Sequence, residues 1–461
     1  MSEKYMKVEL VTYSDETQSI RLAGEEDLDE ASKDADATEN NEETECSYRG
    51  FGDLSGSWVK TAVAFFQFVP AMTQEVLARE SKKSSQHLID HLREIGEVVD
   101  AKDDGETKVE TCLIPLESVS FLPRALTKSF VSINAALVLQ RASLGALVSE
   151  YEAFLGTLLR LVCREKPSAV LGADETIRLA DLECFSDLAE AKDFLLDSKV
   201  EALLHEKSHI ELIKWLEGKF GVNLTSDTEL IRDFVEVCQR RHLLTHAGGV
   251  VNDRYLRICR EQGWKNSDLP EKGSRVSVDP KYIRNATSNI FRMGYFTLHI
   301  LWQKLKSSEL EKAHEHMLSA SHEFLEYDLT KSCRHICNFS LSSKQRPSDK
   351  ISAYMTINKA LSYLFESEID ETERENEIEA VLKSRDWSIV SPTLALALAC
   401  VKKEYENLQQ LTRAAIEDGV DHEAARTWAV FREVRSLPHF IEEFEHKPSK
   451  AVHEISSSSD G

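Results

Sequence analysis

The spacing of apolar positions predicts an all-α protein. From residue 126 onward, apolar residues recur three and four positions apart, as expected for helices that bury one face. After residue 309 the helices become shorter and are joined by polar linkers, which is typical of stacked αα-hairpins. The pattern predicts helices at 126–139, 144–163, 199–220, 226–247, 280–305, 310–324, 329–339, 351–366, 373–383, 393–404, 408–417 and 422–435.

Changes in composition divide the chain into five expected parts. The start carries too few apolar side chains to offset the entropy lost on ordering, apart from a short strand expected at Val8–Tyr13. The expected parts are a disordered acidic arm (1–48), an accessory segment with two helices (49–125), a helical bundle (126–306), a helical-hairpin array (307–450) and a flexible tail (451–461).

Net charge limits the partners that the chain is expected to bind. With 56 Lys and Arg against 79 Asp and Glu, the net charge is −23, which opposes broad affinity for DNA or other nucleic acids. The charge is uneven, because residues 1–47 hold 15 acidic and four basic groups, whereas 232–284 hold 11 basic and seven acidic groups. A narrow basic site within an acidic protein is therefore expected.

Cysteine usage and hydropathy predict a cytoplasmic protein without a membrane span. Nine cysteines lie at irregular positions with no C-x-x-C pair, as expected for free thiols in a reducing compartment. The longest apolar runs, 59–72 and 389–401, are too short to cross a bilayer and contain prolines. The N-terminus lacks the basic-then-apolar order of a signal peptide.

Groups suited to phosphate chemistry gather at the end of the 226–247 helix, which is expected to begin with a Ser226–Glu229 capping box. Imidazole moves protons near neutral pH, and guanidinium grips two phosphate oxygens. Arg241 and His246 lie about 140° apart around the helix axis, so they share a phosphate only through the length of the Arg side chain, a distorted last turn near the glycines, or a second copy across a two-fold axis. A homodimer is therefore expected. The groups are Arg240, Arg241, His242 and His246.

The sequence RRHLLTH followed by AGGVVNDRYL resembles the signature of the HEPN family of all-helical domains. Its hallmark, an Arg, a polar residue and a His at Arg-x4-His spacing, corresponds to Arg241, His242 and His246. The resemblance implies an endoribonuclease that needs no metal or cofactor and cleaves RNA through attack of the 2′-hydroxyl on the neighbouring phosphate. Arg241 would clamp the phosphate, His246 would transfer the proton and His242 would assist. Many members serve bacterial toxin and phage-defence systems, which implies a growth-arresting nuclease held in check.

Residues around this motif are expected to contact RNA. The stretch 252–280 is expected to be a loop in which basic and aromatic side chains alternate, as in surfaces that bind single strands. The alternative is a solvated loop anchored by Trp264. On the 144–163 helix, Glu150 or Glu152 either buffers the arginines or is an ordinary exposed carboxylate. The expected substrate-binding residues are Arg240, Asn252, Arg254 and Tyr255.

Two metal-binding interpretations compete with this one. His205-Glu206-Lys207-Ser208-His209 satisfies the HExxH string of zinc peptidases, which requires both imidazoles on one helix. Lys207 opposes a bound cation, and the residues that follow lack the extended pattern, so an amphipathic helix explains the string equally simply. The pair His242 and His246 could join His205 and His209 in a four-imidazole site only if the two helices pack together.

A non-catalytic adaptor is the alternative from a different functional class. The stretches 358–363 and 397–405 weakly resemble tetratricopeptide-type repeats, with small alanines where helices pack closely. Such arrays usually bind proteins, so a partner or antitoxin is expected on residues 307–450. In this alternative the bundle serves only to dimerise.

Overall fold

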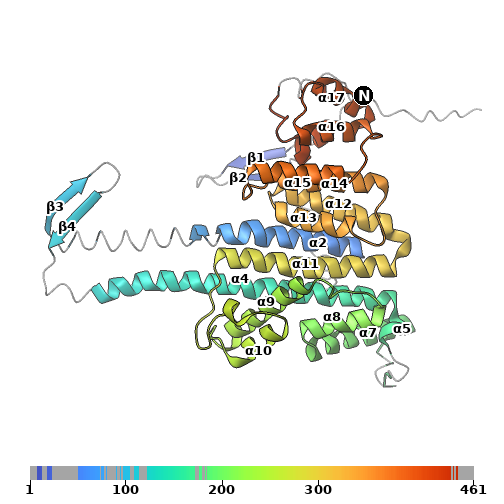
Figure 1. Ribbon diagram of the computed structural model, residues 1–461. Helices are drawn as coiled ribbons and strands as arrows, with labels where there is room; N and C mark the ends of the chain where they lie inside the picture. Colours follow the sequence, from blue (N-terminus) through green and yellow to red (C-terminus); the bar gives the residue numbers. More distant parts are fainter. Residues whose placement is uncertain are drawn as a thin grey trace, which may run out of the picture. The chain divides into compact units, whose positions relative to one another are not determined.

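The structure is a computed structural model that confirms the all-α class. It describes residues 8–12, 18–22, 50–72, 97–103, 108–113, 122–171 and 184–437, with a few single positions besides, and side chains of the long helix from residue 138. The chain separates into two compact units, residues 1–49 and 50–461. Apart from two short hairpins, the elements of the described residues are helical (Figure 1).

The first unit contains one antiparallel hairpin, β1 (Val8–Thr12) and β2 (Gln18–Leu22), with Val8 opposite Leu22. The strand predicted at the N-terminus is thus present, and β2 is an addition to it. The acidic stretch that follows Leu22 lies outside the described residues.

The second hairpin pairs β3 (Glu97–Asp103) with β4 (Lys108–Leu113) in antiparallel fashion. The accessory segment is expected to contain two helices, and this hairpin is an addition to them. Alternating Val109, Thr111 and Leu113 suit a strand, and the Asp104-Gly105 dipeptide between the two strands is typical of turns.

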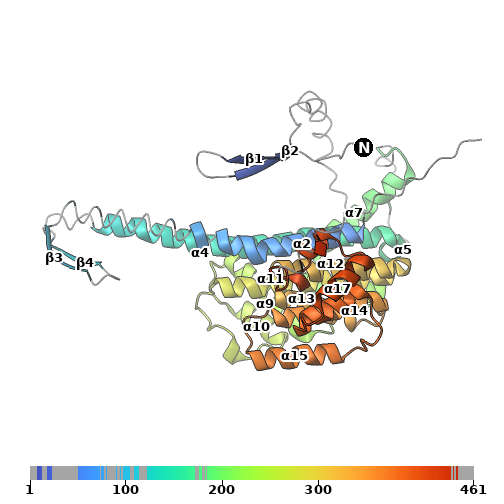
Figure 2. The same cartoon turned by 90° about the horizontal axis from the view of Figure 1, so that it is seen from above.

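Four helices build the core of the bundle. Helix α11 (Pro280–Leu305) packs on α2 (Phe51–Val63), α4 (Leu122–Glu165) and α9 (Thr228–His246), and α2 also packs on α4 (Figures 1 and 2). The predicted break at 140–143 is absent, and α4 is one helix of 44 residues, because that stretch holds no proline or glycine. A π-helical segment, η2 (Ala64–Phe68), continues α2.

The remaining bundle elements correct two predictions. The helix expected at 199–220 is broken, because α7 (Leu188–Glu206) ends before Lys207 and Ser208 caps α8 (His209–Phe220) with Glu211. The loop expected at 252–280 contains a helix, α10 (Asp253–Glu261), and a 3₁₀ turn, η4 (Asn266–Asp268). Short α5 (Pro167–Val170) follows α4.

The C-terminal helices stack as predicted. Neighbours in sequence pack on one another, α12 on α13, α13 on α14, α14 on α15 and α16 on α17. Helix α2 also packs on α12, so the predicted accessory segment contributes to the helical body, whereas the domain boundaries stay a prediction. The elements are η5 (Ser307–Glu309), α12 (Leu310–Glu326), α13 (Thr330–Leu341), α14 (Asp349–Leu364), α15 (Glu371–Lys383), α16 (Pro392–Lys402), α17 (Leu408–Asp418), α18 (His422–Thr427) and η6 (Ala429–Phe431).

Within the part of the chain that the structure describes, no helix is long and apolar enough to cross a membrane. Of the cysteines whose side chains the structure describes, seven are free thiols, and five of these are buried.

A glycine in α11 allows the three central helices to approach closely. A Cβ atom on Gly294 would lie 2.9 Å from Nε1 of Trp58 on α2 and 3.0 Å from the ring of Phe154 on α4. These two rings stack with centroids 4.4 Å apart, and the Trp58 indole N–H donates to the Phe291 carbonyl at 3.2 Å. Both neighbours are held in place, so neither ring can move aside for an added methyl group.

Replacing Gly294 with alanine is expected to destabilise the protein by about 1–3 kcal/mol, because the methyl group overpacks a filled site. The control is Gly145→Ala in α4, where the added Cβ meets nothing within 4 Å. That change is expected to stabilise the helix by about 0.5–1 kcal/mol. Urea unfolding of both variants measures the difference, and equal effects would contradict the close packing at Gly294.

Candidate functional site

Helix α9 begins and ends at well-defined caps. Its N-cap is Asp227, whose carboxylate accepts a hydrogen bond from the Leu230 N–H at 2.9 Å. The observed cap is therefore one residue later than the predicted cap, Ser226. Asp and Ser are about equally favoured at the N-cap position, so residue type alone does not distinguish them. At the other end Gly248 and Gly249 take positive φ angles of 58° and 78°, which confirms the predicted glycine stop.

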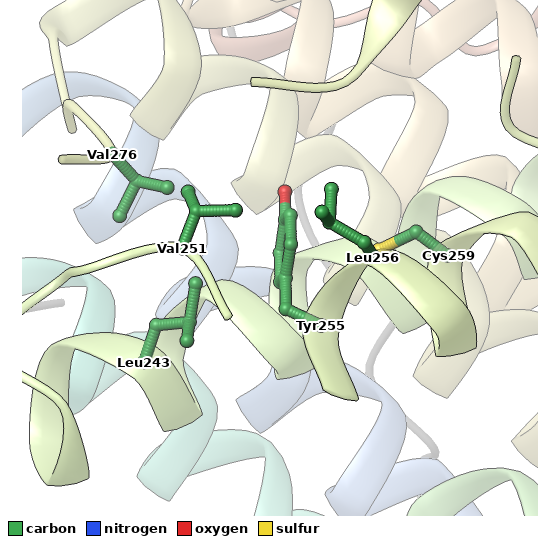
Figure 3. Close-up of a cluster of buried hydrophobic side chains, with 6 residues drawn as sticks. All are labelled: Leu243, Val251, Tyr255, Leu256, Cys259 and Val276. Atoms are coloured by element: carbon green, nitrogen blue, oxygen red, sulfur yellow. The ribbon is translucent and has the colours of Figure 1, made fainter. Parts of the chain in front are cut away.

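A small apolar cluster fixes the chain that follows α9. Figure 3 shows its six residues, with Tyr255 standing between Val251 and Leu256. Backbone hydrogen bonds also join the segment after α9 to the segment before α11. The Val276 N–H donates to the Gly249 carbonyl and the Val251 N–H donates to the Ser274 carbonyl, each at 2.9 Å. Helix α10 is thereby held against the end of α9. The cluster is Leu243, Val251, Tyr255, Leu256, Cys259 and Val276.

A buried carboxylate, Glu236, joins three helices beneath this surface. It accepts hydrogen bonds from Arg240 Nε at 2.7 Å, from the Tyr255 hydroxyl at 2.6 Å and from the Tyr282 hydroxyl at 2.8 Å. The Arg240 guanidinium also lies 4.0 Å from the Tyr282 ring centroid and donates to the Ser277 carbonyl at 2.8 Å. Burial and the Glu236 charge raise the pKa of Tyr255, so its hydroxyl stays a donor.

Three of the four predicted substrate-binding residues are engaged in contacts within the fold. Arg240 is engaged on all sides by the Glu236 network, and Tyr255 is 1% exposed, so its ring cannot stack on a base. Asn252 caps α10 by accepting a hydrogen bond from the Tyr255 N–H at 2.9 Å. Trp264 is an anchor, as in the alternative, since its indole N–H donates to the Arg232 carbonyl. Arg254 alone of the four is exposed and makes no ion pair with the described residues.

The surface at the end of α9 carries Arg241, His242, His246 and Arg254, here named the basic cluster. The rings of His242 and His246 lie 4.7 Å apart between centroids. Partial burial, and then the charges of His246, Arg254 and Arg241, lower the pKa of His242. The imidazole of His242 is therefore neutral near pH 7 and surrounded by positive charge, which suits a proton acceptor beside a bound anion.

Arg241 and His246 do not contact each other, as their helical spacing requires. Arg241 pairs with Glu152 on α4, its Nη2 lying 3.4 Å from Oε2, whereas His246 lies beside His242 with its ring tilted by 50° and is exposed. Of the two glutamates considered as buffers for the arginines, Glu152 is the one that pairs. Within one copy of the chain, the Arg241 guanidinium and the His246 imidazole therefore point in different directions around α9.

A second group of side chains meets where α4, α8 and α9 pack. Glu152 also accepts from His209 Nε2, 3.2 Å from Oε1, and His209 hydrogen-bonds the half-buried Cys238. Burial alone would lower the pKa of His209, but Cys238 and Glu152 outweigh it and raise that pKa to about 10. His209 is therefore a cation at neutral pH. Nothing in the spacing of the motif signals this group, because its members come from three separate helices.

These contacts do not favour the metal-binding interpretations. His205 is at the exposed end of α7 and His209 begins α8, so the two imidazoles of the HExxH string do not share a helix. His209 is engaged with Glu152 as a cation, which cannot ligate a metal. Among the residues that the structure describes, no group of three or more His, Cys, Asp or Glu side chains is suited to a metal ion.

Comparison with protein-family models, curated proteins and solved structures finds no match for this chain. The functional argument therefore rests on the residues themselves.

Replacing Glu236 with glutamine is expected to lower the free energy of unfolding by about 3 kcal/mol, because it leaves the buried Arg240 guanidinium without its counter-charge. The matched control is Glu261→Gln, which breaks an exposed Arg–Glu pair of the same i,i+4 type on α10, at Arg257. Its effect should stay within about 0.5 kcal/mol. Urea unfolding measures both, and similar losses in the two variants would contradict the role of Glu236.

The raised pKa of His209 predicts a pH-dependent contribution to stability. The pKa rises from the ordinary value of 6.5 to about 10 in the folded protein, so the stabilisation is complete below pH 6.5 and is lost as the pH approaches 10. The destabilisation caused by His209→Asn should therefore be largest at pH 6 and should shrink at pH 10. His205→Asn, at an exposed helix end, is the control. An NMR titration of wild-type His209 near pH 6.5 would overturn the assignment.

Proposed function

We propose that this protein is a metal-independent endoribonuclease whose active site is the basic cluster. The observation that supports the proposal is the environment of His242. Its neutral imidazole lies beside His246, and the positive charges of Arg254 and Arg241 help to lower its pKa. A phosphodiester placed there gains two guanidinium partners and two imidazoles that can exchange protons. The HEPN resemblance of residues 241–246 adds the reaction: the ribose 2′-oxygen loses its proton and attacks the neighbouring phosphorus, the bond from that phosphorus to the 5′-oxygen breaks, and a protonated 5′-hydroxyl leaves a 2′,3′-cyclic phosphate.

Each group in the cluster has a defined part in the proposed reaction. Arg241 and Arg254 hold non-bridging phosphate oxygens and oppose the charge that develops in the transition state. His246 transfers a proton, and His242 assists as the second imidazole, because its lowered pKa keeps it unprotonated near neutral pH. Glu152 orients Arg241 through their ion pair. Arg240, expected from the sequence to assist, instead positions α9 through Glu236.

The proposal includes a homodimer. Arg241 and His246 of one copy occupy different sides of α9, and Glu152 holds Arg241 on its side. A second copy related by a two-fold axis places the imidazole of one protomer opposite the guanidinium of the other, because such an interface presents each patch twice. One phosphate can then contact both groups.

The setting follows from the same resemblance and from the array. A growth-arresting nuclease of a toxin or phage-defence system needs an inhibitor or trigger, and the stacked hairpins of residues 310–431 offer a surface for a protein partner. Cytoplasmic location agrees with seven free cysteines among the described residues.

Purified full-length protein is expected to cut single-stranded RNA in the presence of EDTA and to leave 2′,3′-cyclic phosphate ends. His246→Ala should reduce the rate by at least about 100-fold, because it removes a proton-transfer group. Arg241→Ala should cause a loss of about the same size by removing charge stabilisation. Gel electrophoresis of end-labelled RNA measures the cleavage rate, and circular dichroism checks that the variants fold.

Controls come from the same residue types at sites outside the cluster. His422→Ala on α18 and Arg257→Ala on α10 should cut RNA at the wild-type rate. Undiminished cleavage by His246→Ala would remove the assignment of the site. A wild-type protein that folds and dimerises yet cuts no RNA would instead support the adaptor.

A further inference from the structure

A cavity of about 880 Å³ lies at the other end of α9, apart from the basic cluster. Its walls come from the start of α9, from α11, α13 and α14, and from the segments that follow α13 and α15. Asp227, the cap of α9, is one of the lining residues, and 14 positions of helix separate it from Arg241, about 21 Å. No member of the basic cluster lines the cavity.

The lining of this cavity is positively charged in a chain whose net charge is −23. It holds four cationic side chains and one carboxylate, Asp227. Arg292 pairs with that carboxylate at 3.0 Å, and Arg385 pairs with an exposed aspartate outside the cavity. Arg346 and Lys359 make no ion pair with the described residues. Two cations thus remain available to an anionic ligand.

Four buried polar atoms on lining residues have no hydrogen-bond partner among the described residues. They are Arg292 Nε, Thr297 Oγ1, His335 Nδ1 and Arg385 Nε. Burial, followed by the charges of Arg292 and Arg334, lowers the pKa of His335 to about 4, so its ring is neutral at pH 7 and can donate one hydrogen bond. These buried atoms leave unmet hydrogen-bonding capacity in the wall, while Arg346 and Lys359 are the groups that remain accessible to an anionic ligand.

Part of the wall is aromatic and apolar. Phe296 of α11 and Phe339 of α13 stack with centroids 4.3 Å apart and an interplanar angle of 12°. Both line the cavity, together with Leu230, Met293 and Ile300. A charged, donor-rich region and a flat apolar region therefore share one cavity, which has the size and mixed lining of small-molecule sites.

We propose that this cavity binds a small organic phosphate that carries a planar aromatic ring system, the ligand class that nucleoside monophosphates represent. Arg346 and Lys359 pair with the phosphate, since their charges are otherwise unmet by the described residues. The planar body lies against the Phe296–Phe339 pair. A metal cation or a neutral apolar molecule would leave the excess positive charge uncompensated. The proposal does not depend on RNA cleavage, because the two sites share no residue.

The test is isothermal titration calorimetry of the full-length protein with AMP, adenosine and inorganic phosphate. AMP should bind at least tenfold more tightly than either of the other probes, because only AMP fills both regions of the cavity. The double variant Arg346→Ala/Lys359→Ala should weaken AMP binding at least tenfold and leave adenosine binding unchanged. Phe339→Leu should weaken the binding of AMP and leave that of phosphate unchanged. The matched control, Lys344→Ala in the same α13–α14 linker but outside the lining, should bind AMP as the wild type does.

Two further results decide where AMP binds. The His246→Ala and Arg254→Ala variants should keep wild-type affinity for AMP, whatever their effect on RNA cleavage. A drop of AMP affinity in Arg254→Ala with none in the double variant would overturn the proposal and assign the nucleotide to the basic cluster. Absence of AMP binding at millimolar concentration, or equal affinities for AMP and phosphate, would overturn it as well.

Discussion

The position of the basic cluster depends on one buried carboxylate. Glu236 binds one guanidinium and two phenol hydroxyls, and these come from its own helix, from α10 and from α11. A buried charge is tolerated only when its hydrogen-bonding capacity is met, so the three partners are fixed relative to one another. With α10 and α11 tied to the last turns of α9, the exposed side chains that follow Arg240 project from a rigid base. A phosphate-binding surface gains from this rigidity, because its donors need no rearrangement when charge develops.

The helices of this fold are largely readable from the sequence, whereas their interruptions are not. Periodic apolar positions report the face that a helix buries, and they place α11 and the six helices from α12 to α17 within a few residues. A helix breaks where capping side chains satisfy the backbone groups of a new helix end, and the spacing of apolar residues does not reveal such a cap. Ser208 and Glu211 form a capping box in the middle of an apolar pattern and divide it into α7 and α8. In α4, by contrast, nothing in 140–143 competes with the helix, so two predicted helices are one. The short helix α10 depends on burying Tyr255, a tertiary contact.

The candidate site likewise has a part that local sequence predicts and a part that depends on tertiary contacts. Arg241, His242 and His246 are visible in the sequence because a capped helix and a glycine stop place all three near the same end of α9. Which of these side chains reaches solvent, however, depends also on partners from other segments of the chain. Arg240 and Arg241 are adjacent, yet the first turns to Glu236 and Ser277, and the second turns to Glu152 on α4. The Glu152–His209–Cys238 group combines residues 57 and 29 positions apart, and no local spacing rule predicts such a contact.

Net charge bears on which anions these surfaces accept. The repulsion between an acidic chain and a polyanion decays over about 8 Å at physiological ionic strength, so only charges near the contact decide the encounter. A long nucleic acid lies across many acidic neighbours, and each added phosphate contact must be matched by a nearby cation. The basic cluster supplies two guanidinium groups, one of which pairs with Glu152. The cavity at the start of α9 supplies Arg346 and Lys359, which make no ion pair with the described residues. Both surfaces therefore suit one or two phosphates rather than a long strand, which limits the proposed RNA substrate to a short footprint at the cluster and fits the single phosphorylated molecule proposed for the cavity.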